Sequence, residues 1–408
     1  AKLGLHGVVS EADFLALCEG RHPGAGSRLT ARLNTERRQA GKTVANRRVF
    51  YDFTLSPPKS VSVVGLMRDD RILALHERTV RETLRELERY AETRVRKGGS
   101  DDARVTGNIV AATFRHDTSR ELDPHLHTHC VVFNATFDSV ENRWKALQVH
   151  GMFRAQRFAA NFYYHELSKG LRALGYELEP TARDFEIKGV PRETVARFSK
   201  RHQQIDAETK RRLAREGLRG NLNAVRRQVA EAQRQRKVKD STVDRLRPFW
   251  SEQLSRAETK ALAQLQPREV AHAPKADPTA AVAWADERLF ERRSVVHDFE
   301  LMAEALARGR GENFGLADLR RAIERRNYVR EDRTTRVTSR DVLAWELEVV
   351  LAAHDGRGRH RPLNPNYAPS SKLSPEQAKA AGKILGSRDF ITLFRGGAGT
   401  GKSFTLKE

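Results

Sequence analysis

The chain contains 408 residues, a length that allows two or three domains, each with its own apolar core. Lysine and arginine total 74 against 53 aspartate and glutamate residues, so the formal net charge at pH 7 is +21. A positive field of this size favours a polyanionic partner, of which nucleic acid is the commonest. With two cysteines in the whole chain, the composition argues against a disulfide framework.

Cysteine usage and hydropathy also bear on the compartment. Cys18 and Cys130 form no C-x-x-C pair, which suits a reducing cytoplasm. The sequence has no run of 18 apolar residues and no charged-then-apolar leader, so it predicts neither a membrane span nor a signal peptide. The chain opens with Ala1 in place of methionine and stops shortly after Ser403, so we expect it to be part of a longer protein.

The first half of the chain mixes strand and helix patterns. Residues 47–64 alternate apolar and polar side chains around Pro57-Pro58, which predicts a strand, a tight loop and then a helix or short strand. Apolar residues at helical spacing predict a long amphipathic helix over 68–95. Two β-type runs, 104–115 and 126–136, are joined by a polar loop and predict an antiparallel pair.

The pattern then becomes increasingly helical. Residues 149–174 have helical spacing and end before Gly175, a residue suited to the position after a helix. Residues 182–189 predict a further strand, and Pro191 fits the first turn of the next helix. From 192 to about 265 the pattern is helical and very basic.

The last third predicts a linker and two smaller parts. Three prolines mark a linker after residue 265, and residues 279–355 predict a small helical domain. A strip rich in Pro, Asn and Ser, 361–372, closes that domain. A helix over 374–386 and a strand over 390–394 then lead into a glycine-rich loop.

Positive charge is concentrated between Arg192 and Trp250. This stretch contains 17 basic and 7 acidic residues and so carries +10 of the net +21. Clusters such as 210–212 and 234–237 can neutralise phosphates, which makes Arg236 and Lys237 candidate DNA contacts. For any single residue of the stretch, a solvated helix face is the simpler interpretation.

Four histidines, at positions 116, 125, 127 and 129, lie within fourteen residues. Side chains at i and i+2 of a strand point the same way, so His127 and His129 can reach one ion. Neutral imidazole nitrogens suit Zn, Mn and similar ions and leave positions open for a phosphate oxygen. Spacing alone leaves two candidates for a third ligand, His125 on the same strand and His116 on its partner.

A carboxylate and a lysine precede this cluster in the sequence. Asp52, on a predicted strand, could orient one histidine or accept a proton from a nucleophile. Lys59 follows Pro57-Pro58 on a rigid loop and could meet a phosphate. Each signal is weak alone, because a strand aspartate is more often part of a salt bridge.

A phosphate-binding loop closes the chain. Residues 396–403 (GGAGTGKS) fit G-x-x-x-x-G-K-[ST] in full, so backbone N–H groups near Gly399 and Gly401 should cradle phosphates. Lys402 would neutralise the β/γ charge and Ser403 would hold Mg²⁺. Gln377, at a helix start capped by Ser374, is placed to read adenine, although it would also be unremarkable as part of a cap.

Taken together, these residues resemble the MobF-type conjugative relaxases of the TrwC/TraI group from residue 1 to about 255. The resemblance is carried by 52–60 (DFTLSPPKS), 114–120 (FRHDTSR) and 123–129 (DPHLHTH), with support from 174–176 and 198–201. It implies an α+β fold: a central antiparallel sheet with flanking helices, related to the HUH endonucleases. The rest of the chain resembles the continuation of that family into a superfamily-1, RecD-like helicase.

The resemblance also implies roles for individual residues. The matching histidines of the family bind a divalent metal (Mg, Mn or Zn), which selects His116 with His127 and His129, and the aspartate matching Asp52 assists a nucleophilic tyrosine. Lysines and arginines in the matched segments become candidate DNA contacts. These are Lys59, Arg120, Lys200 and Arg201.

The nucleophile itself is not assigned. The catalytic tyrosines of the family lie in a short N-terminal segment that is absent here. Tyr51 should point away from Asp52, and Tyr163-Tyr164 fall in a predicted helix where the family has structural residues. We therefore expect the chain as given to bind metal and DNA but to nick poorly or not at all.

The implied function is metal-dependent, site- and strand-specific nicking at a plasmid origin of transfer by tyrosine transesterification. In the longer protein, ATP and Mg would drive unwinding by the helicase domain. Implied partners are single-stranded and hairpin DNA, relaxosome accessory proteins and a type IV coupling protein, in the bacterial cytoplasm or after transfer to the recipient cell. Two alternatives stay open: a DNA-binding platform of a helicase with a degenerate nuclease, and a rolling-circle replication initiator.

The expected domain organisation follows from these assignments. Residues 1–255 form the relaxase domain without its N-terminal strand, and 256–278 form a linker. Residues 279–360 form a small helical domain before the helicase. Residues 373–408 begin the α/β helicase domain with its first strand and phosphate-binding loop.

Overall fold

The structure is a computed structural model of the chain. The residues that it describes are 2–31, 33, 35–39, 42–97, 100–181, 184–216, 222–232, 242–265, 276–332 and 334–408. The predicted DNA contacts Arg236 and Lys237 lie outside these ranges.

The chain forms two compact units. Unit 1 comprises Ala1–Asp286 with Phe299–Ala322, and unit 2 comprises Glu287–Asp298 with Ile323–Glu408. The segment 299–322, which the sequence placed in a separate helical domain, therefore belongs with unit 1. The domain boundaries proposed from the sequence stay a prediction.

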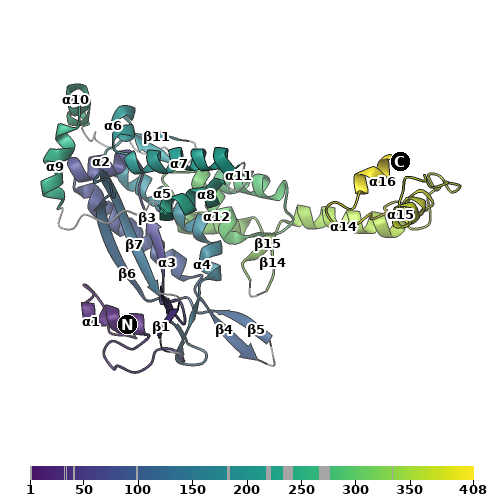
Figure 1. Ribbon diagram of the computed structural model, residues 1–408, viewed down its shortest axis with the longest axis horizontal. Helices are drawn as coiled ribbons and strands as arrows, with labels where there is room; N and C mark the ends of the chain where they lie inside the picture. Colours follow the sequence, from purple (N-terminus) through teal and green to yellow (C-terminus); the bar gives the residue numbers. More distant parts are fainter. Residues whose placement is uncertain are drawn as a thin grey trace. The chain divides into compact units, whose positions relative to one another are not determined.

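The centre of unit 1 is a three-stranded antiparallel sheet (Figure 1). Its strands are β3 (Phe50–Leu55), β7 (Pro124–Phe133) and β6 (Ala111–Thr118), with β7 in the middle. The predicted antiparallel pair is confirmed as β6 and β7, although the first predicted run divides, because β5 ends at Val105 and β6 begins six residues later. The α+β class with antiparallel sheets is thus observed.

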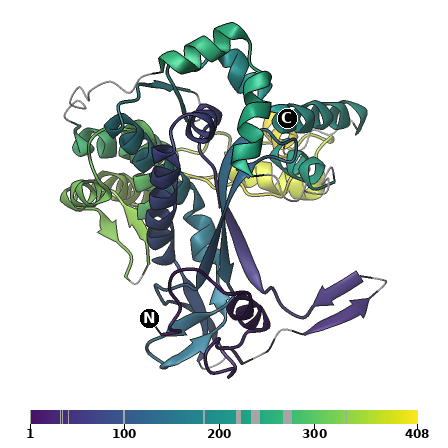
Figure 2. The ribbon, with the colours of Figure 1, turned by 90° about the vertical axis from the view of Figure 1, so that its left-hand side faces the viewer.

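Helices cover one face of this sheet. The helix predicted after Pro57-Pro58 is α2 (Lys59–Met67), and the long amphipathic helix is α3 (Arg71–Glu88). Figure 2 shows α3 lying along the strands, and α5 (Gln156–Ala173) packs beside it. Gly170 allows this approach, because a Cβ there would lie 2.2 Å from Leu75 Cδ1.

A shorter helix covers part of the opposite face. Helix α1 (Glu11–Glu19) buries Leu17 against Val131 and Phe133 of β7. Phe14 of the same helix makes edge contacts with Phe133 and with Phe114 of β6. This apolar cover lies at one end of the face, and the histidines lie at the other.

Smaller elements complete unit 1. Its remaining strands form antiparallel groups: β1 (Glu36–Gln39) with β2 (Lys42–Ala45); β10 (Leu147–Gln148), β4 (Glu92–Lys97) and β5 (Ser100–Val105); β8 (Thr136–Asp138) with β9 (Arg143–Lys145); and β11 (Leu178–Pro180) with β12 (Phe185–Ile187). Further helices are α4 (His150–Arg154), α6 (Arg192–Arg197), α7 (Lys200–Glu216), α8 (Leu222–Ala232), α9 (Val243–Glu252) and α10 (Arg256–Gln264).

The first part of the expected linker is helical instead. Helix α10 begins at Arg256 because Ser255 and Glu258 form a capping box, and Leu262 anchors the helix in the core. This correction moves the start of any linker beyond Gln264. Residues 266–275 lie outside the described part of the chain.

The chain continues through α11 (Pro278–Phe290), α12 (Asp298–Arg308) and α13 (Leu316–Arg325). Unit 2 contains a small antiparallel sheet in the order β13 (Val296–His297), β15 (Arg336–Thr338) and β14 (Val329–Arg330). Its helices are α14 (Arg340–Asp355), α15 (Pro375–Leu385) and α16 (Lys402–Lys407). Within the described residues, none of the helices is both long and apolar enough to span a bilayer.

The strand predicted over 390–394 does not form. These residues have no regular structure, and Phe390 and Leu393 are 59% and 90% exposed. A strand of an α/β domain is stabilised by neighbouring strands and by burial on both faces. No described strand pairs with this segment, so its apolar sequence alone does not hold it extended in a sheet.

Residues 299–322 are joined to unit 1 by polar contacts as well as by apolar packing. Asn161 of α5 donates to the carbonyl of Ala303 at 3.0 Å, and Arg320 pairs with Glu86 of α3. His165 of α5 is buried and donates from Nε2 to the carbonyl of Phe314 at 2.9 Å. Burial lowers the pKa of His165 to about 4, although this hydrogen bond raises it.

We expect His165 to make unit 1 sensitive to acid. The unfolded chain takes up a proton at His165 near pH 6.5 and the folded chain does so near pH 4, so the free energy of unfolding falls as pH drops through this window. In His165→Gln, which keeps an N–H donor but does not titrate, this fall should be shallower. Urea unfolding followed by tryptophan fluorescence between pH 7 and 4.5 measures it.

The matched control is His354→Gln, since the His354 side chain is 76% exposed. Its pH dependence should equal that of the parent chain. Equal slopes for His165→Gln and the parent would contradict the assignment.

Candidate active site

Strand register gathers five polar side chains on one face of the central sheet. His127 and His129 alternate along β7, so both point to the same side. The pairing places His116 of β6 opposite His127, and Thr54 of β3 opposite His129. Asp52 lies two residues before Thr54 and therefore shares this face.

The three histidines predicted as ligands form a triangle. Their ring centroids are 5.3 Å apart for His116 and His127, 5.4 Å for His116 and His129, and 5.2 Å for His127 and His129. Three imidazoles that bind one ion at ~2.1 Å with near-tetrahedral angles have centroids about 5 Å apart. The separations therefore match those of a shared ion.

The orientation of the three histidine rings fits a shared ion less well than their separation does. As the side chains stand, no group of three or more His, Cys, Asp or Glu residues in the described part of the chain could hold a metal ion. We attribute the difference to ring rotation, because the terminal torsion of histidine has a broad energy well and the backbone already sets the separations. The residue types and the separation of the rings, and not their present orientation, are therefore what support a metal site here.

Hydrogen bonds to Nδ1 direct the opposite ring nitrogens. The Nδ1 atom of His129 lies 2.7 Å from Asp52 Oδ2 and 3.2 Å from Thr54 Oγ1. The Nδ1 atom of His127 lies 2.9 Å from the carbonyl oxygen of His125. When Nδ1 carries the proton and donates in this way, the lone pair of the ring lies on Nε2, which is the usual arrangement of a metal-binding histidine.

His125, the alternative third ligand, takes a different place. Its ring stacks on that of His127 with centroids 4.7 Å apart. Burial, helped by the nearby charges of Lys59 and His127, lowers the pKa of His125 to about 3. His125 is therefore neutral, and its ring packs against the ring of His127.

The opposite face of β7 is closed. Thr128 points into the core, where its hydroxyl lies 2.7 Å from Nε2 of His76, and Nδ1 of His76 lies 2.8 Å from the hydroxyl of Tyr163. All three residues are buried. This network was not predicted, because nothing in the sequence spacing connects positions 76, 128 and 163. Thr54 was not predicted either, although the i+2 alternation from Asp52 could have indicated it.

The predicted DNA contacts make internal bonds. Lys59 donates to the carbonyl of Pro124 at 2.9 Å, and burial lowers the pKa of Lys59 to about 8, although Asp123 and Glu186 raise it. Lys200 pairs with Asp123 at 3.2 Å, and Arg201 donates to the carbonyl of Ala230 at 3.1 Å. Arg120 lies in the turn between β6 and β7.

The glycine loop adopts a turn in unit 2. Gly399 and Gly401 have φ of +77° and +74°, which favour glycine. Lys402 donates to the carbonyls of Gly396 and Gly397 at 2.8 and 2.7 Å, so the loop encloses its own lysine. Two further predicted residues flank it: Gln377 donates to the carbonyl of Thr400 at 3.3 Å, and Ser403 lies in the first turn of α16. Nucleotide binding by this loop stays a prediction.

The family model of the TrwC relaxase matches residues 1–257 of the chain. The chain belongs to this family. The resemblance noted around Asp52 and His116 is thereby confirmed. The helicase part of the prediction is not covered by this match.

Known relatives agree with this assignment. The chain is 38% identical over 216 residues to the multifunctional conjugation protein TraI of Escherichia coli, and 35% identical over 216 residues to that of strain K12. Each match covers 50% of the chain but 12% of the relative, so the chain spans a small part of the length of these proteins.

Solved structures of TrwC have the same fold. The chain is 32% identical to TrwC in a copper-bound complex with oriT DNA, with a TM-score of 0.53 over 64% of this chain and 84% of that one. A metal-free complex with oriT DNA and a complex with a 27-mer that comprises the recognition hairpin and the cleavage site both give TM-scores of 0.52 at 32% identity. Each of these covers 64% of this chain and 88% of the other.

The reactivity of Cys130 tests whether the face of β7 opposite the histidines is closed to solvent. Burial, reinforced by the charge of Asp52, raises the pKa of Cys130 to about 12. We expect iodoacetamide at pH 8 to modify Cys18, which is half-buried, well before Cys130 in the folded chain. Peptide mass spectrometry over time gives both rates.

Cys18→Ala is the control, because it leaves Cys130 as the sole thiol. Modification of Cys130 should then need denaturant. Equal rates with and without denaturant would show that this face of β7 is open.

Proposed function

We infer that the chain supplies the nicking centre of a conjugative relaxase, which cleaves one strand of DNA at an origin of transfer. The observation that supports this most strongly is the triangle of His116, His127 and His129 beside Asp52. Related structures of TrwC contain oriT DNA, and one contains a 27-mer with the recognition hairpin and the cleavage site. The basic charge of this chain suits the same kind of ligand.

The three imidazoles would hold a divalent ion through their ring nitrogens. When bound, such an ion polarises a phosphate oxygen and offsets negative charge that develops during phosphoryl transfer. The contribution of Asp52 is orientation: its carboxylate accepts from Nδ1 of His129 and fixes the tautomer that presents Nε2. Thr54 adds a second contact to the same nitrogen.

We assign the nucleophile to none of the tyrosines near the sheet. Tyr51 pairs with Val132 and so points away from Asp52, and its ring packs on Phe153. Tyr163 is fully buried, and burial raises its pKa well above the ordinary value. The attacking tyrosine would come from the N-terminal segment that the family resemblance implies, leaving a 5′-phosphotyrosyl link and a free 3′-OH.

The remaining functions would need further segments, as the family resemblance implies. We propose that the glycine loop around Lys402 opens an ATP-dependent helicase that unwinds the nicked strand, with ATP and Mg as its cofactors. Relaxosome accessory proteins and a type IV coupling protein would be its partners in a bacterial cytoplasm, and the relaxase would enter the recipient cell with the DNA. The multifunctional TraI relatives support this extension.

Metal binding is the first test. In the full chain, alanine at His116, His127 or His129 should weaken Mn²⁺ binding by about 100-fold, and Asp52→Asn by about 10-fold, since a residue that orients a ligand costs less than the ligand itself. Isothermal titration calorimetry measures these affinities. His150→Ala, at an exposed position, is the control and should bind as the parent does. Parent-like binding by all four site variants would exclude the proposed metal site.

Strand cleavage is the second test. A longer natural form that carries the tyrosine segment should nick a single-stranded origin oligonucleotide in Mg²⁺ or Mn²⁺ and stay covalently attached to the 5′ end of the product. Denaturing gels that resolve the protein–DNA adduct give the readout, with His129→Ala in the same form as the inactive comparison. An intact oligonucleotide after incubation with the unmutated form would rule out the endonuclease assignment.

A further inference from the structure

We propose that Asp123 and Trp250 are positioning residues, which hold the turn between β6 and β7 and thereby set the separation of the three histidines. This proposal rests on the proposed function, because it concerns the geometry of the same site. Asp123 bonds to the start of α7 and Trp250 bonds to the backbone of the turn, so both would act on the histidines through the backbone.

The turn between the two histidine strands is irregular. The pairing of β6 with β7 shifts register between His116 and Thr118, directly beside one of the proposed ligands. The turn is closed by a bond from the N–H of Ser119 to the carbonyl of Asp123 at 2.9 Å. Leu122 adopts φ of +56°, a left-handed conformation that is unfavourable for a residue with a side chain. Contacts with other elements of the fold are therefore needed to hold the turn in this conformation.

Asp123 provides an electrostatic link to α7. Its side chain is 1% exposed, and Oδ2 accepts the backbone N–H of Lys200 at 3.1 Å while Oδ1 pairs with Nζ of Lys200 at 3.2 Å. Nζ of Lys200 also donates to Gln253 at 2.8 Å. Breaking a buried ion pair by removing one partner leaves the other charge uncompensated, so Asp123 ties the turn firmly to the start of α7.

Trp250 provides a second link, from α9. Its Nε1–H donates to the carbonyl of Leu122 at 2.6 Å, which is the residue in the left-handed conformation. The indole is fully buried in a cluster with Leu126 and Phe198. A third contact, from Lys59 of α2 to the carbonyl of Pro124, completes the set. Three helices therefore hold three consecutive residues, 122–124: Leu122 and Pro124 by their carbonyls and Asp123 by its side chain.

The consequence for the site follows from strand geometry. Slippage of β7 by one residue would move every side chain to the other face of the sheet. Much smaller changes matter too, since a metal site tolerates about 0.5 Å of displacement in its ligands. The turn begins one residue after Thr118, where the register shift ends, and it ends at Asp123, four residues before His127. Loosening the turn would therefore change the distance between His116 and His127 first.

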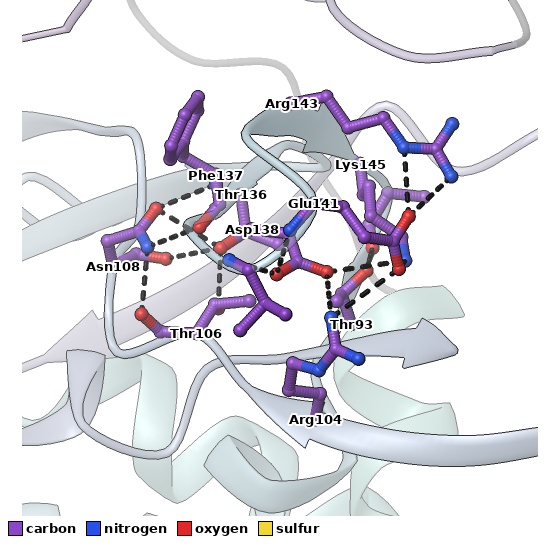
Figure 3. Close-up of polar contacts among 12 residues, drawn as sticks. Thr93, Arg104, Thr106, Asn108, Thr136, Phe137, Asp138, Glu141, Arg143 and Lys145 are labelled. Carbon is purple, nitrogen blue, oxygen red and sulfur yellow. Dashed lines mark hydrogen bonds and ion pairs between the residues drawn. The ribbon is translucent and has the colours of Figure 1, made fainter.

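The test compares two buried carboxylates in the full chain. Asp123→Ala removes the link to α7, and Trp250→Phe removes the N–H donor while keeping an aromatic ring in the core. The matched control is Asp138→Ala (Figure 3). The Asp138 side chain is also 1% exposed and pairs with Arg104 at 2.8 Å and Lys145 at 3.4 Å, but it belongs to the β8–β9 hairpin and not to the histidine turn.

We expect Asp123→Ala and Trp250→Phe each to weaken Mn²⁺ binding by about 10-fold or more, as for outer-shell residues of metal sites. Asp138→Ala should lose thermal stability yet bind Mn²⁺ within about twofold of the parent. The Co²⁺ absorption spectrum should change in the first two variants and not in the control, because it reports coordination geometry. Asp123→Asn, which keeps an acceptor for the Lys200 N–H, should restore part of the affinity.

A second readout needs no metal. Amide hydrogen exchange of residues 125–129 should accelerate in Asp123→Ala and Trp250→Phe but not in Asp138→Ala. Unchanged exchange and parent-like Mn²⁺ binding in both variants would overturn the proposal, and so would an equal loss of affinity in Asp138→Ala. If the parent chain does not bind Mn²⁺, the proposed function fails, and the exchange data alone then decide whether the turn is held as described.

Discussion

The antiparallel register of β7 with its two neighbours is the constraint on which the rest of the site depends. It places His116 opposite His127 and Thr54 opposite His129, so two flanking strands contribute to a cluster that one strand could not form. The same register turns the alternate residues of β7 toward the helices, where Thr128 bonds to His76. Chemistry on one face and core packing on the other are therefore fixed together.

Local patterns in the sequence predicted most of what surrounds this register. The β-type run before the histidines indicated two paired strands. The i+2 spacing of His127 and His129 indicated that both could bind one metal ion. Spacing did not decide between His116 and His125, because the choice depends on cross-strand pairing. The structure brings His116 into the triangle, whereas His125 stacks on His127 with a neutral ring.

Other expectations failed where tertiary context outweighs local pattern. Apolar character over 390–394 indicated a strand, but a strand needs partners, and no described strand pairs with it. The start of the linker at 256 is a different case, because the capping box at Ser255 and the helical spacing up to about 265 are local signals for a helix that the proposed boundary did not use. Lys59 and Lys200 carry the right charge for phosphate binding, and each is paired with backbone or carboxylate of its own chain, so DNA contact by either residue stays a prediction. Internal pairing of this kind has no signature in composition.

Strand β7 has a consequence for how such a protein can diversify. From Leu126 to Val132 each residue is committed, with alternate positions given to the histidine face and to the sealed core. A substitution along this stretch affects either the histidine face or the buried core, so no position in it is free to vary. We therefore expect adaptation to a new DNA sequence to arise in the surrounding helices and hairpins and not in β7.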